Sequence, residues 1–283
     1  MNNFSQEPGR RVVTDAAGLN SFLTRMYGNM TLAVLVSAFS AYLTMGVFRS
    51  AVFGFFSAHP GMVWVILLLP IALSMGVSFS ATRNPVGAFI MLMLTAIIYG
   101  VEFAIIAGVY SGASIASAFV SSAAVFVTMA LYGTITKRDL SKFGAHAMAA
   151  LIALMIAYLI NMFLQSPAIA YIFSFIAVII FTVLTAWDAQ KMKQIYINYG
   201  GEVSTNGLAV LGALQLYLDF VNLFISLLQI FGMSDRNELQ VSVLHVILLL
   251  YCKIVRGCRK TKVFLSLFTI FKNYLLTFFL LVK

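Results

Sequence analysis

Seven stretches of about 20 apolar residues dominate this sequence. They lie near residues 29–48, 61–81, 86–108, 113–135, 145–164, 168–187 and 208–232. At 1.5 Å per residue, a helix of about 20 residues spans roughly 30 Å, the thickness of the hydrocarbon core of a bilayer. The chain is 61% hydrophobic and 10% charged, against roughly 45–50% and 25% in soluble domains. The sequence therefore predicts an all-α membrane protein with seven transmembrane helices, and it excludes an ordinary soluble enzyme.

Three regions are expected along the chain. Residues 1–28 are polar and lack the short apolar core and cleavage site of a signal peptide, so they are interpreted as a cytoplasmic segment. Residues 29–237 form the expected membrane domain. Residues 238–283 are poor in Ala and Gly and rich in Leu, Phe and Lys, and this basic apolar tail is interpreted as an extra span or as a non-native extension. Both cysteines, Cys252 and Cys258, lie in the tail, so no thiol chemistry is expected in the body.

The distribution of basic residues predicts the orientation. With the N-terminus inside, the inner segments carry nine Lys and Arg residues, namely Arg10, Arg11, Arg25, Arg83, Lys137, Arg138, Lys142, Lys191 and Lys193. The outer loops between the spans carry only Arg49. Because cytoplasmic loops are enriched in Lys and Arg, we expect a multi-pass protein of the cell (inner) membrane with a cytoplasmic N-terminus. The net charge of +9 does not indicate nucleic-acid binding, because no soluble domain is expected to carry a basic face.

The last predicted span carries a stripe of polar side chains. The polar stripe recurs at steps of three and four residues and consists of Gln215, Asp219, Asn222, Ser226 and Gln229. This spacing places all five on one helix face. A polar group facing lipid costs several kcal/mol, so we expect this helix to be central, with the stripe toward other helices or a water-filled cavity. The alternative is a seam of hydrogen bonds that only packs helices together.

Two further acids lie in or at the edge of predicted spans. Asp188 closes the sixth span, and Glu102 lies in the third with Thr95 and Tyr99 on its face. An ionised acid at the bilayer centre costs about 2.5–3.5 kcal/mol on insertion scales, so both are candidate functional residues. The alternatives are an interfacial acid for Asp188, and a protonated, locally hydrogen-bonded acid for Glu102. Glu102 is otherwise expected to line a pore near its outer end.

Two segments resemble the signature of a known family. They are Ala186-Trp187-Asp188 and the run Leu216–Phe224, which reads Leu-Tyr-Leu-Asp-Phe-Val-Asn-Leu-Phe. Both are similar to motifs of the Bax inhibitor-1 family, and the body of the chain resembles its bacterial branch over about residues 20–233.

The resemblance implies a fold of seven helices in which the last is wrapped by the other six. It further implies a pH-sensitive calcium leak channel that takes part in stress responses. In such a channel, Asp188 and Asp219 would form a proton-sensing pair that gates the pore and offers oxygen ligands to Ca²⁺. Arg83 is the candidate latch for this pair, although the region offers one arginine where relatives can have a cluster. Ca²⁺ would be the permeant ion, and no bound cofactor is expected.

Other functions remain open alternatives. The resemblance also fits a non-conducting membrane regulator that binds a membrane AAA protease or another stress or cell-death factor. An enzyme is not expected: residues 108–112 carry one residue too many for the Gly-x-Ser-Gly turn of a rhomboid protease, and the His-Glu-x-x-His motif of metalloproteases is absent. No internal repeat supports a secondary transporter. The lipid bilayer is the one certain partner, and the oligomeric state is left open.

Overall fold

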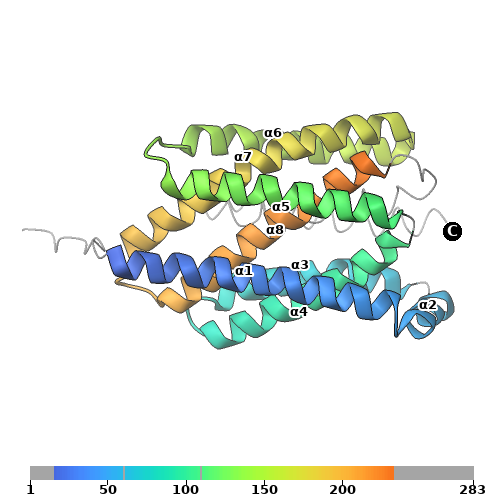
Figure 1. Cartoon of the computed structure of the whole chain (residues 1–283), viewed down its shortest axis with the longest axis horizontal. Helices are drawn as coiled ribbons and strands as arrows, with labels where there is room; N and C mark the ends of the chain where they lie inside the picture. The colour runs from blue at the N-terminus through green and yellow to red at the C-terminus, as the bar shows by residue number, and fades with distance from the viewer. Residues whose placement is uncertain (1–15, 60, 109, 233–283) are drawn as a thin grey trace, which may run out of the picture.

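The computed structural model describes residues 16–59, 61–108 and 110–232, and these residues form helices joined by short connections (Figure 1). The expected tail, 238–283, lies outside the described residues. The helices in chain order are α1 (Ala16–Met45), α2 (Arg49–Ala58), α3 (Met62–Ser80), α4 (Pro85–Ala107), α5 (Gly112–Ile135), α6 (Ser141–Leu164), α7 (Pro167–Tyr199) and α8 (Thr205–Phe231).

The starts of several helices follow from local sequence. Asn84 accepts a hydrogen bond from the Gly87 N–H and is followed by Pro85, whose fixed φ suits the first helical position. Ser111 and Ser204 cap α5 and α8 in the same way, accepting from the N–H groups of Ser114 and Gly207. These caps separate the helices with connections of a few residues, so consecutive helices turn back on one another.

Six helices are long and apolar enough to cross a membrane: α1, α4, α5, α6, α7 and α8. The seventh expected span, residues 61–81, corresponds to α3, whose apolar part Trp64–Ser80 is shorter. The described part of the chain is therefore an all-helical membrane protein of eight helices, six of which are candidate spans. The additional helix, α2, lies in the first connection, where no helix was expected.

Two helices extend beyond their predicted spans. α1 begins at Ala16 rather than near residue 29, and α7 continues to Tyr199 rather than ending near residue 187. Hydropathy marks only the part of a helix that contacts hydrocarbon, whereas the backbone hydrogen bonds of a helix persist into water. The polar extension of α7 meets no glycine or proline before Gly200, so nothing in the sequence ends it earlier.

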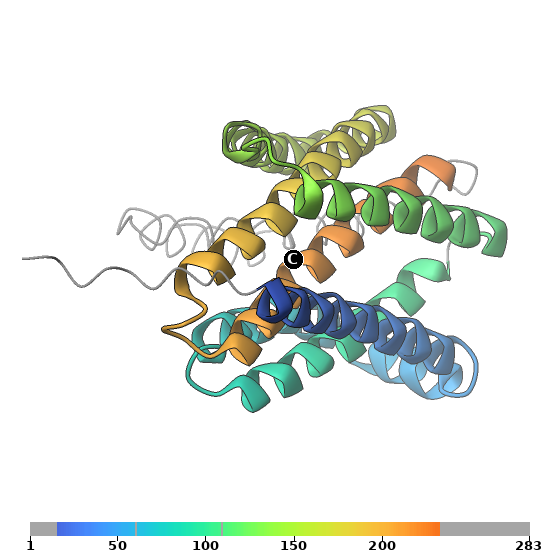
Figure 2. The ribbon, with the colours of Figure 1, turned by 60° about the vertical axis from the view of Figure 1, so that its left-hand side comes forward.

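α8 is the most thoroughly buried helix. Every residue from Gly207 to Gln229 except Leu211 is buried. α8 packs against α1, α3, α4, α5 and α7, and α6 packs mainly against α7. Figures 1 and 2 show α8 running obliquely, with α1, α3 and α4 on one side and α5, α6 and α7 on the other.

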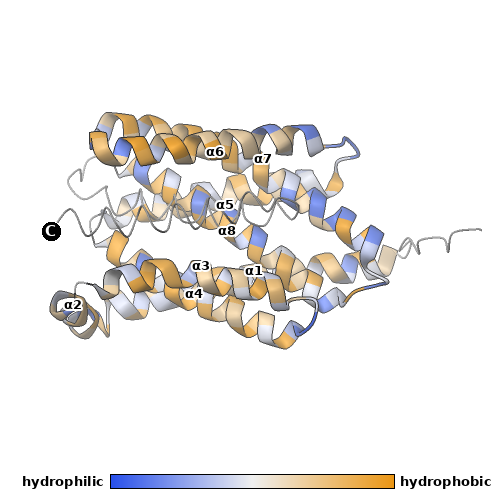
Figure 3. Ribbon diagram, turned by 180° about the vertical axis from the view of Figure 1, so that it is seen from behind, coloured by the Kyte–Doolittle hydropathy of each residue, from blue (hydrophilic) through white to orange (hydrophobic). Residues whose placement is uncertain are grey.

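The outer surface is apolar. Large side chains such as Leu35 (60% exposed), Val120 and Ile179 point outward from α1, α5 and α7, and Figure 3 shows hydrophobic colouring along the outer helices. A soluble protein rarely exposes so large an apolar area. This outer apolar surface is the part of the fold that contacts lipid.

The basic residues gather at one end of the molecule. Arg25 of α1 donates to the Asn206 side chain at the start of α8. Lys193 of α7 donates to the Thr134 carbonyl at the end of α5, with Nζ and O 2.8 Å apart. The α5–α6 connection, which contains Arg138, is tied to the same part of α7. These contacts involve the ends of four helices and the α5–α6 connection, and this end of the molecule carries most of the hydrophilic colouring in Figure 3.

Glycines allow the closest helix approaches. A Cβ at Gly133 of α5 would lie 2.0 Å from the Ala186 carbonyl oxygen of α7, and one at Gly207 of α8 would lie 1.8 Å from the Ala81 carbonyl oxygen. Both neighbours are backbone atoms, so no side-chain rotation relieves such a clash. Small residues at helix crossings are the usual basis of close packing in membranes.

Gly133→Ala should therefore destabilise the protein. The added methyl group must push α5 away from α7, and overpacking of this kind costs about 1–3 kcal/mol. Thermal melting of the detergent-solubilised protein measures the effect. The matched control is Gly28→Ala in α1, where a Cβ meets no atom within 4 Å, and helix propensity there predicts a gain of up to about 1 kcal/mol. Equal melting temperatures for the two variants would contradict this account of the α5–α7 contact.

Candidate functional site

Asp219 lies near the middle of α8 and is 0% exposed. The other members of the polar stripe, Gln215, Asn222, Ser226 and Gln229, are also buried. Each of these side chains is therefore enclosed by protein in the part of the chain that the structure describes. Burial alone does not single the stripe out, however, because nearly all of α8 is buried.

The hydrogen bonds of the stripe are incomplete within the described residues. Asn222 Nδ2 donates to the Leu218 carbonyl and Ser226 Oγ donates to the Asn222 carbonyl, each over 2.7 Å. Ser174 Oγ of α7 donates to Gln229 Oε1 over 2.5 Å. Gln215 Oε1, Asn222 Oδ1 and Gln229 Nε2 are buried and have no hydrogen-bond partner among the described residues. Each such atom costs about 1–3 kcal/mol if it stays unpaired, so the stripe retains hydrogen-bonding capacity that the contacts among the described residues do not use.

Asp188 lies inside α7 and is 1% exposed. Its carboxyl group is enclosed by protein, and α7 continues for eleven residues beyond it. Its neighbour Lys191 lies over the Trp187 ring, with Nζ 4.7 Å from the ring centroid. The interfacial pairing expected around Asp188 is thus made by Trp187 and Lys191, while the carboxyl group is buried.

The contacts between α7 and α8 show the relative depth of the two acids. Met192 of α7 lies beside Gly212 of α8, with its Cε 3.1 Å from the position of a Gly212 Cβ, and Ser174 bonds Gln229. Asp188 is four residues before Met192 and Asp219 is seven residues after Gly212. Because the helices run antiparallel, the two acids differ in depth by about three residues, or roughly 5 Å. Asp188 and Asp219 thus lie within about one helical turn of a common depth on two packed helices.

Gln190, two residues after Asp188, ties α7 to the α5–α6 connection. Its Oε1 accepts from the Leu140 N–H over 2.8 Å, and its Nε2 donates to the Arg138 carbonyl over 2.7 Å. Sequence reasoning missed this residue, although it directly follows the Trp187-Asp188-Ala189 segment. The feature of the sequence that could have indicated this contact is the polar glutamine side chain at position 190.

Arg83 is exposed in the turn between α3 and α4. The preceding Ala81 approaches Gly207 at the start of α8, which lies twelve residues from Asp219, about 18 Å along the helix. The structure places this candidate latch at the basic end of the molecule, at a different depth from the two acids.

Glu102 of α4 is 1% exposed and lies close enough to Tyr217 of α8 for the two to interact electrostatically. The Tyr217 hydroxyl is 2.6 Å from Ser37 Oγ of α1, and its ring centroid is 5.8 Å from that of Tyr99. Sequence reasoning missed Ser37 and Tyr217, although Tyr217 belongs to the quoted motif.

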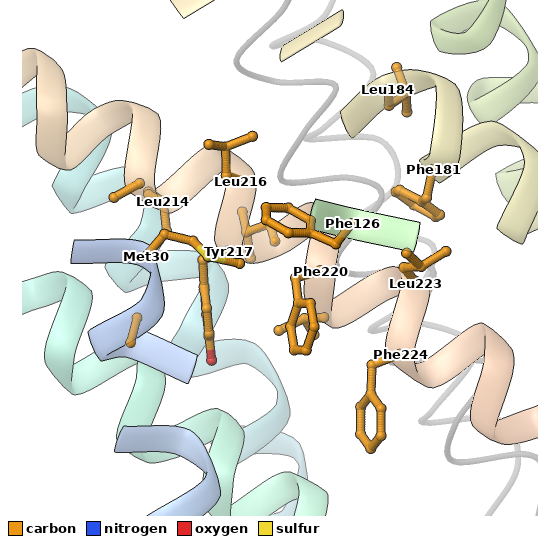
Figure 4. Packing of buried hydrophobic residues seen from close by; sticks show 14 of the residues in the cluster. Met30, Phe126, Phe181, Leu184, Leu214, Leu216, Tyr217, Phe220, Leu223 and Phe224 are labelled. Atoms are coloured by element: carbon orange, nitrogen blue, oxygen red, sulfur yellow. The ribbon is translucent and has the colours of Figure 1, made fainter. Parts of the chain in front are cut away.

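Tyr217 projects from α8 together with Phe220 and Phe224 (Figure 4). Counted at about 100° per residue, these three lie roughly 140–180° around α8 from the centre of the polar stripe. Glu102 is therefore near the face of α8 opposite Asp219. The two acids belong to separate buried polar clusters.

The described residues contain no group of three or more His, Cys, Asp or Glu side chains that could hold a metal ion. Ca²⁺ takes six to eight oxygen ligands, and Asp188 and Asp219 together supply four.

Comparison with known proteins gives consistent matches over the body of the chain. A family model described as "Inhibitor of apoptosis-promoting Bax1" matches residues 19–236. The inner membrane protein YbhL of Escherichia coli K12 is 38% identical over 228 residues, covering 78% of this chain and 95% of YbhL. An uncharacterized membrane protein of Streptococcus pyogenes serotype M3 is 38% identical over 218 residues, covering 77% of this chain and 95% of its own.

A third relative, the uncharacterized protein YrjE of Lactococcus lactis, is 33% identical over 221 residues, which is 94% of its length. The family match includes both signature segments and all six candidate spans except the first turn of α1. The resemblance inferred from the sequence is therefore confirmed, and the chain belongs to the Bax inhibitor-1 family of membrane proteins.

Proposed function

We propose that the protein is a pH-sensitive cation leak channel, with Ca²⁺ as the permeant ion, gated by Asp188 and Asp219. In this proposal α8 is the central helix, wrapped by the other membrane helices. The observation that carries it is the placement of two fully buried acids at nearly the same depth on the packed helices α7 and α8. Membership of the Bax inhibitor-1 family agrees with it.

The gate follows from the electrostatics of two carboxyl groups. In a medium of low dielectric constant, two neighbouring carboxyl groups cannot both ionise cheaply, so they share one proton. Loss of the shared proton places two negative charges on adjoining helices, which repel each other and leave their oxygens free for a hard cation. One proton thus controls both the contact between α7 and α8 and the affinity for the ion.

Glu102 is proposed as a second pore-lining acid that draws cations from the outer side. It lies five residues before the end of α4, close to the end of the molecule that carries few charges. Its position beside Tyr217 separates it from the aspartate pair, so its contribution is to entry of the ion rather than to the response to pH. Arg83 remains the candidate latch, acting on the pair after movement of the α3–α4 turn.

We place the protein in the inner membrane with its basic end in the cytoplasm. One relative, YbhL, is named an inner membrane protein. Among the described residues, the basic end holds Arg25, Arg83, Lys137, Arg138, Lys142, Lys191 and Lys193, and the opposite end holds Arg49. This distribution follows the positive-inside bias.

A non-conducting regulator of a membrane AAA protease or a stress factor is the second candidate. The family description, which names an inhibitor of a cell-death promoter, favours it. A regulator would need no ion path and no proton-dependent gate. Ion flux through the purified protein therefore separates the two functions.

Asp219→Asn should abolish the pH dependence of Ca²⁺ flux. Asparagine keeps the size of the side chain but cannot ionise, so no shared proton remains to be lost. The measurement is dye-reported Ca²⁺ flux in liposomes containing the purified protein, between about pH 5 and 8. Asp188→Asn is expected to have the same effect, because a single remaining acid has no second carboxyl group with which to share a proton. An unchanged pH profile in both variants would end the proposal, and absence of flux at every pH would favour the regulator.

Asp139→Asn is the matched control for these variants. Asp139 lies in the α5–α6 connection, where the Ser141 hydroxyl and N–H donate to its carboxylate over 2.6 and 2.9 Å. These hydrogen bonds lower the pKa of Asp139, so it stays ionised throughout the tested range and titrates only at more acidic pH. We expect the wild-type pH profile in this variant.

Glu102→Gln should lower the Ca²⁺ flux several-fold at every pH without moving its pH midpoint. The amide removes the charge that attracts the cation but leaves Asp188 and Asp219 intact. The same liposome assay measures both quantities. Unchanged flux would assign Glu102 a purely structural role.

Lys137→Cys should react with a membrane-impermeant maleimide only from the cytoplasmic side, and Arg49→Cys only from the outer side. Both positions are exposed, at opposite ends of the molecule. The background for this test replaces Cys252 and Cys258 with serine, which leaves the chain without other thiols. Labelling of intact cells and of inverted vesicles reads out the side, and the reverse pattern would overturn the orientation.

A further inference from the structure

A cavity of about 200 Å³ lies between α1, α4, α5 and α8, away from the aspartate pair. It is lined by the side of α8 that bears Tyr217, Phe220 and Phe224, which Figure 4 shows pointing the same way. Its walls are apolar, and the polar side chains that reach it are Ser37 and Tyr217, which bond each other. Nothing in the proposed gate uses this cavity.

The cavity lies where α1 and α5 separate. Near the basic end the two helices are joined, because the Tyr27 hydroxyl of α1 is 2.6 Å from Thr134 Oγ1 and donates to the Ala130 carbonyl of α5. Ala38, which lines the cavity, is eleven residues farther along α1, about 16 Å from that junction. Both helices pack against α8, but within the described residues they pack little against each other.

The lining is continuous with the outer apolar surface. Ala38 of α1 and Phe119 of α5 line the cavity and are also exposed. Phe119 leans over α8, with its ring centroid 5.8 Å from that of Phe220 and 6.3 Å from that of Phe224. Their neighbours Leu35 and Val120 point outward. The cavity thus opens sideways, toward the hydrocarbon of the membrane.

Size and chemistry restrict what can enter. Apolar cavities stay dry, and one of about 150 Å³ is large enough for benzene, so a cavity of about 200 Å³ takes a short run of methylene groups but not a protein helix. A charged or strongly polar ligand would leave its polar groups unpaired against these walls. The apolar molecule present at high concentration beside the opening is the acyl chain of a membrane lipid.

We propose that this cavity is a binding site for the acyl chain of a membrane phospholipid, which enters between α1 and α5 and packs against Phe220 and Phe224 of α8. The bound chain fills the space that α1, α4 and α5 leave between them beside the apolar face of α8. Its binding requires no ion conduction and is independent of the proposed gate.

Photolabelling tests this site. The protein is reconstituted in phosphatidylethanolamine vesicles that contain a small fraction of the same lipid with a diazirine on its acyl chain. After illumination, adducts are mapped by mass spectrometry. We expect the peptides carrying Ala38 and Phe119 to be labelled several-fold more than those carrying Ile156 and Ile160, which are exposed on α6 and do not line this cavity.

Ala38→Phe should remove this excess, because the ring fills the mouth of the cavity. Ala116→Phe is the matched control: Ala116 is exposed on α5 and does not line the cavity, so the excess should persist. If Ala38→Phe is not recovered folded by size-exclusion chromatography, Ala41→Leu, at another lining position, takes its place.

Equal labelling of the cavity and of α6 in the wild-type protein would overturn the proposal. That result is also expected if a second copy of the chain or residues 233–283 fill the cavity. An excess that survives Ala38→Phe or Ala41→Leu would overturn it as well. Because labelling is measured without ion flux, failure of the channel proposal leaves this test unaffected.

Discussion

The cost of exposing a polar group to hydrocarbon governs this fold. α8 carries the five residues of the polar stripe, and such a helix is stable in a membrane only where protein surrounds it. The structure meets this requirement by burying α8 from Gly207 to Gln229, with Leu211 as the exception. The helices around it turn apolar side chains outward and contribute small residues at the crossings, as Gly133 does for α5. The burial of α8 thus accounts for the apolar outer faces of the surrounding helices and for the small residues at their crossings.

The two faces of α8 divide the interior chemically. The stripe side meets α7, where Ser174 bonds Gln229 and Asp188 lies within about one turn of the depth of Asp219. The other side carries Tyr217, Phe220 and Phe224 toward α1, α4 and α5, where Ser37 and Glu102 supply the polar contacts. The proposed gate and the proposed lipid site therefore lie on opposite faces of the same helix, so a substitution can alter one without touching the other.

The sequence predicts those features that depend on hydropathy and periodicity. The apolar segments locate the six candidate spans, and the steps of three and four around Asp219 predict a buried polar face. Polar continuations of helices escape a hydropathy argument, which is why α1 starts before its predicted span and α7 runs on to Tyr199. A hydropathy argument also does not predict contacts between distant segments. No local pattern indicates that Gln190 would form hydrogen bonds with Arg138 and Leu140, or that the Tyr217 hydroxyl would bond Ser37. These pairings depend on how whole helices cross.

The close approach of Gly133 to the Ala186 carbonyl brings the crossing of α5 and α7 beside one of the buried acids. Asp188 lies two residues from the contact, about 3 Å, whereas Tyr199 lies thirteen residues away, about 20 Å. Any side chain at position 133 would therefore displace α7 beside the buried carboxyl group of Asp188 and not at the far end of the helix.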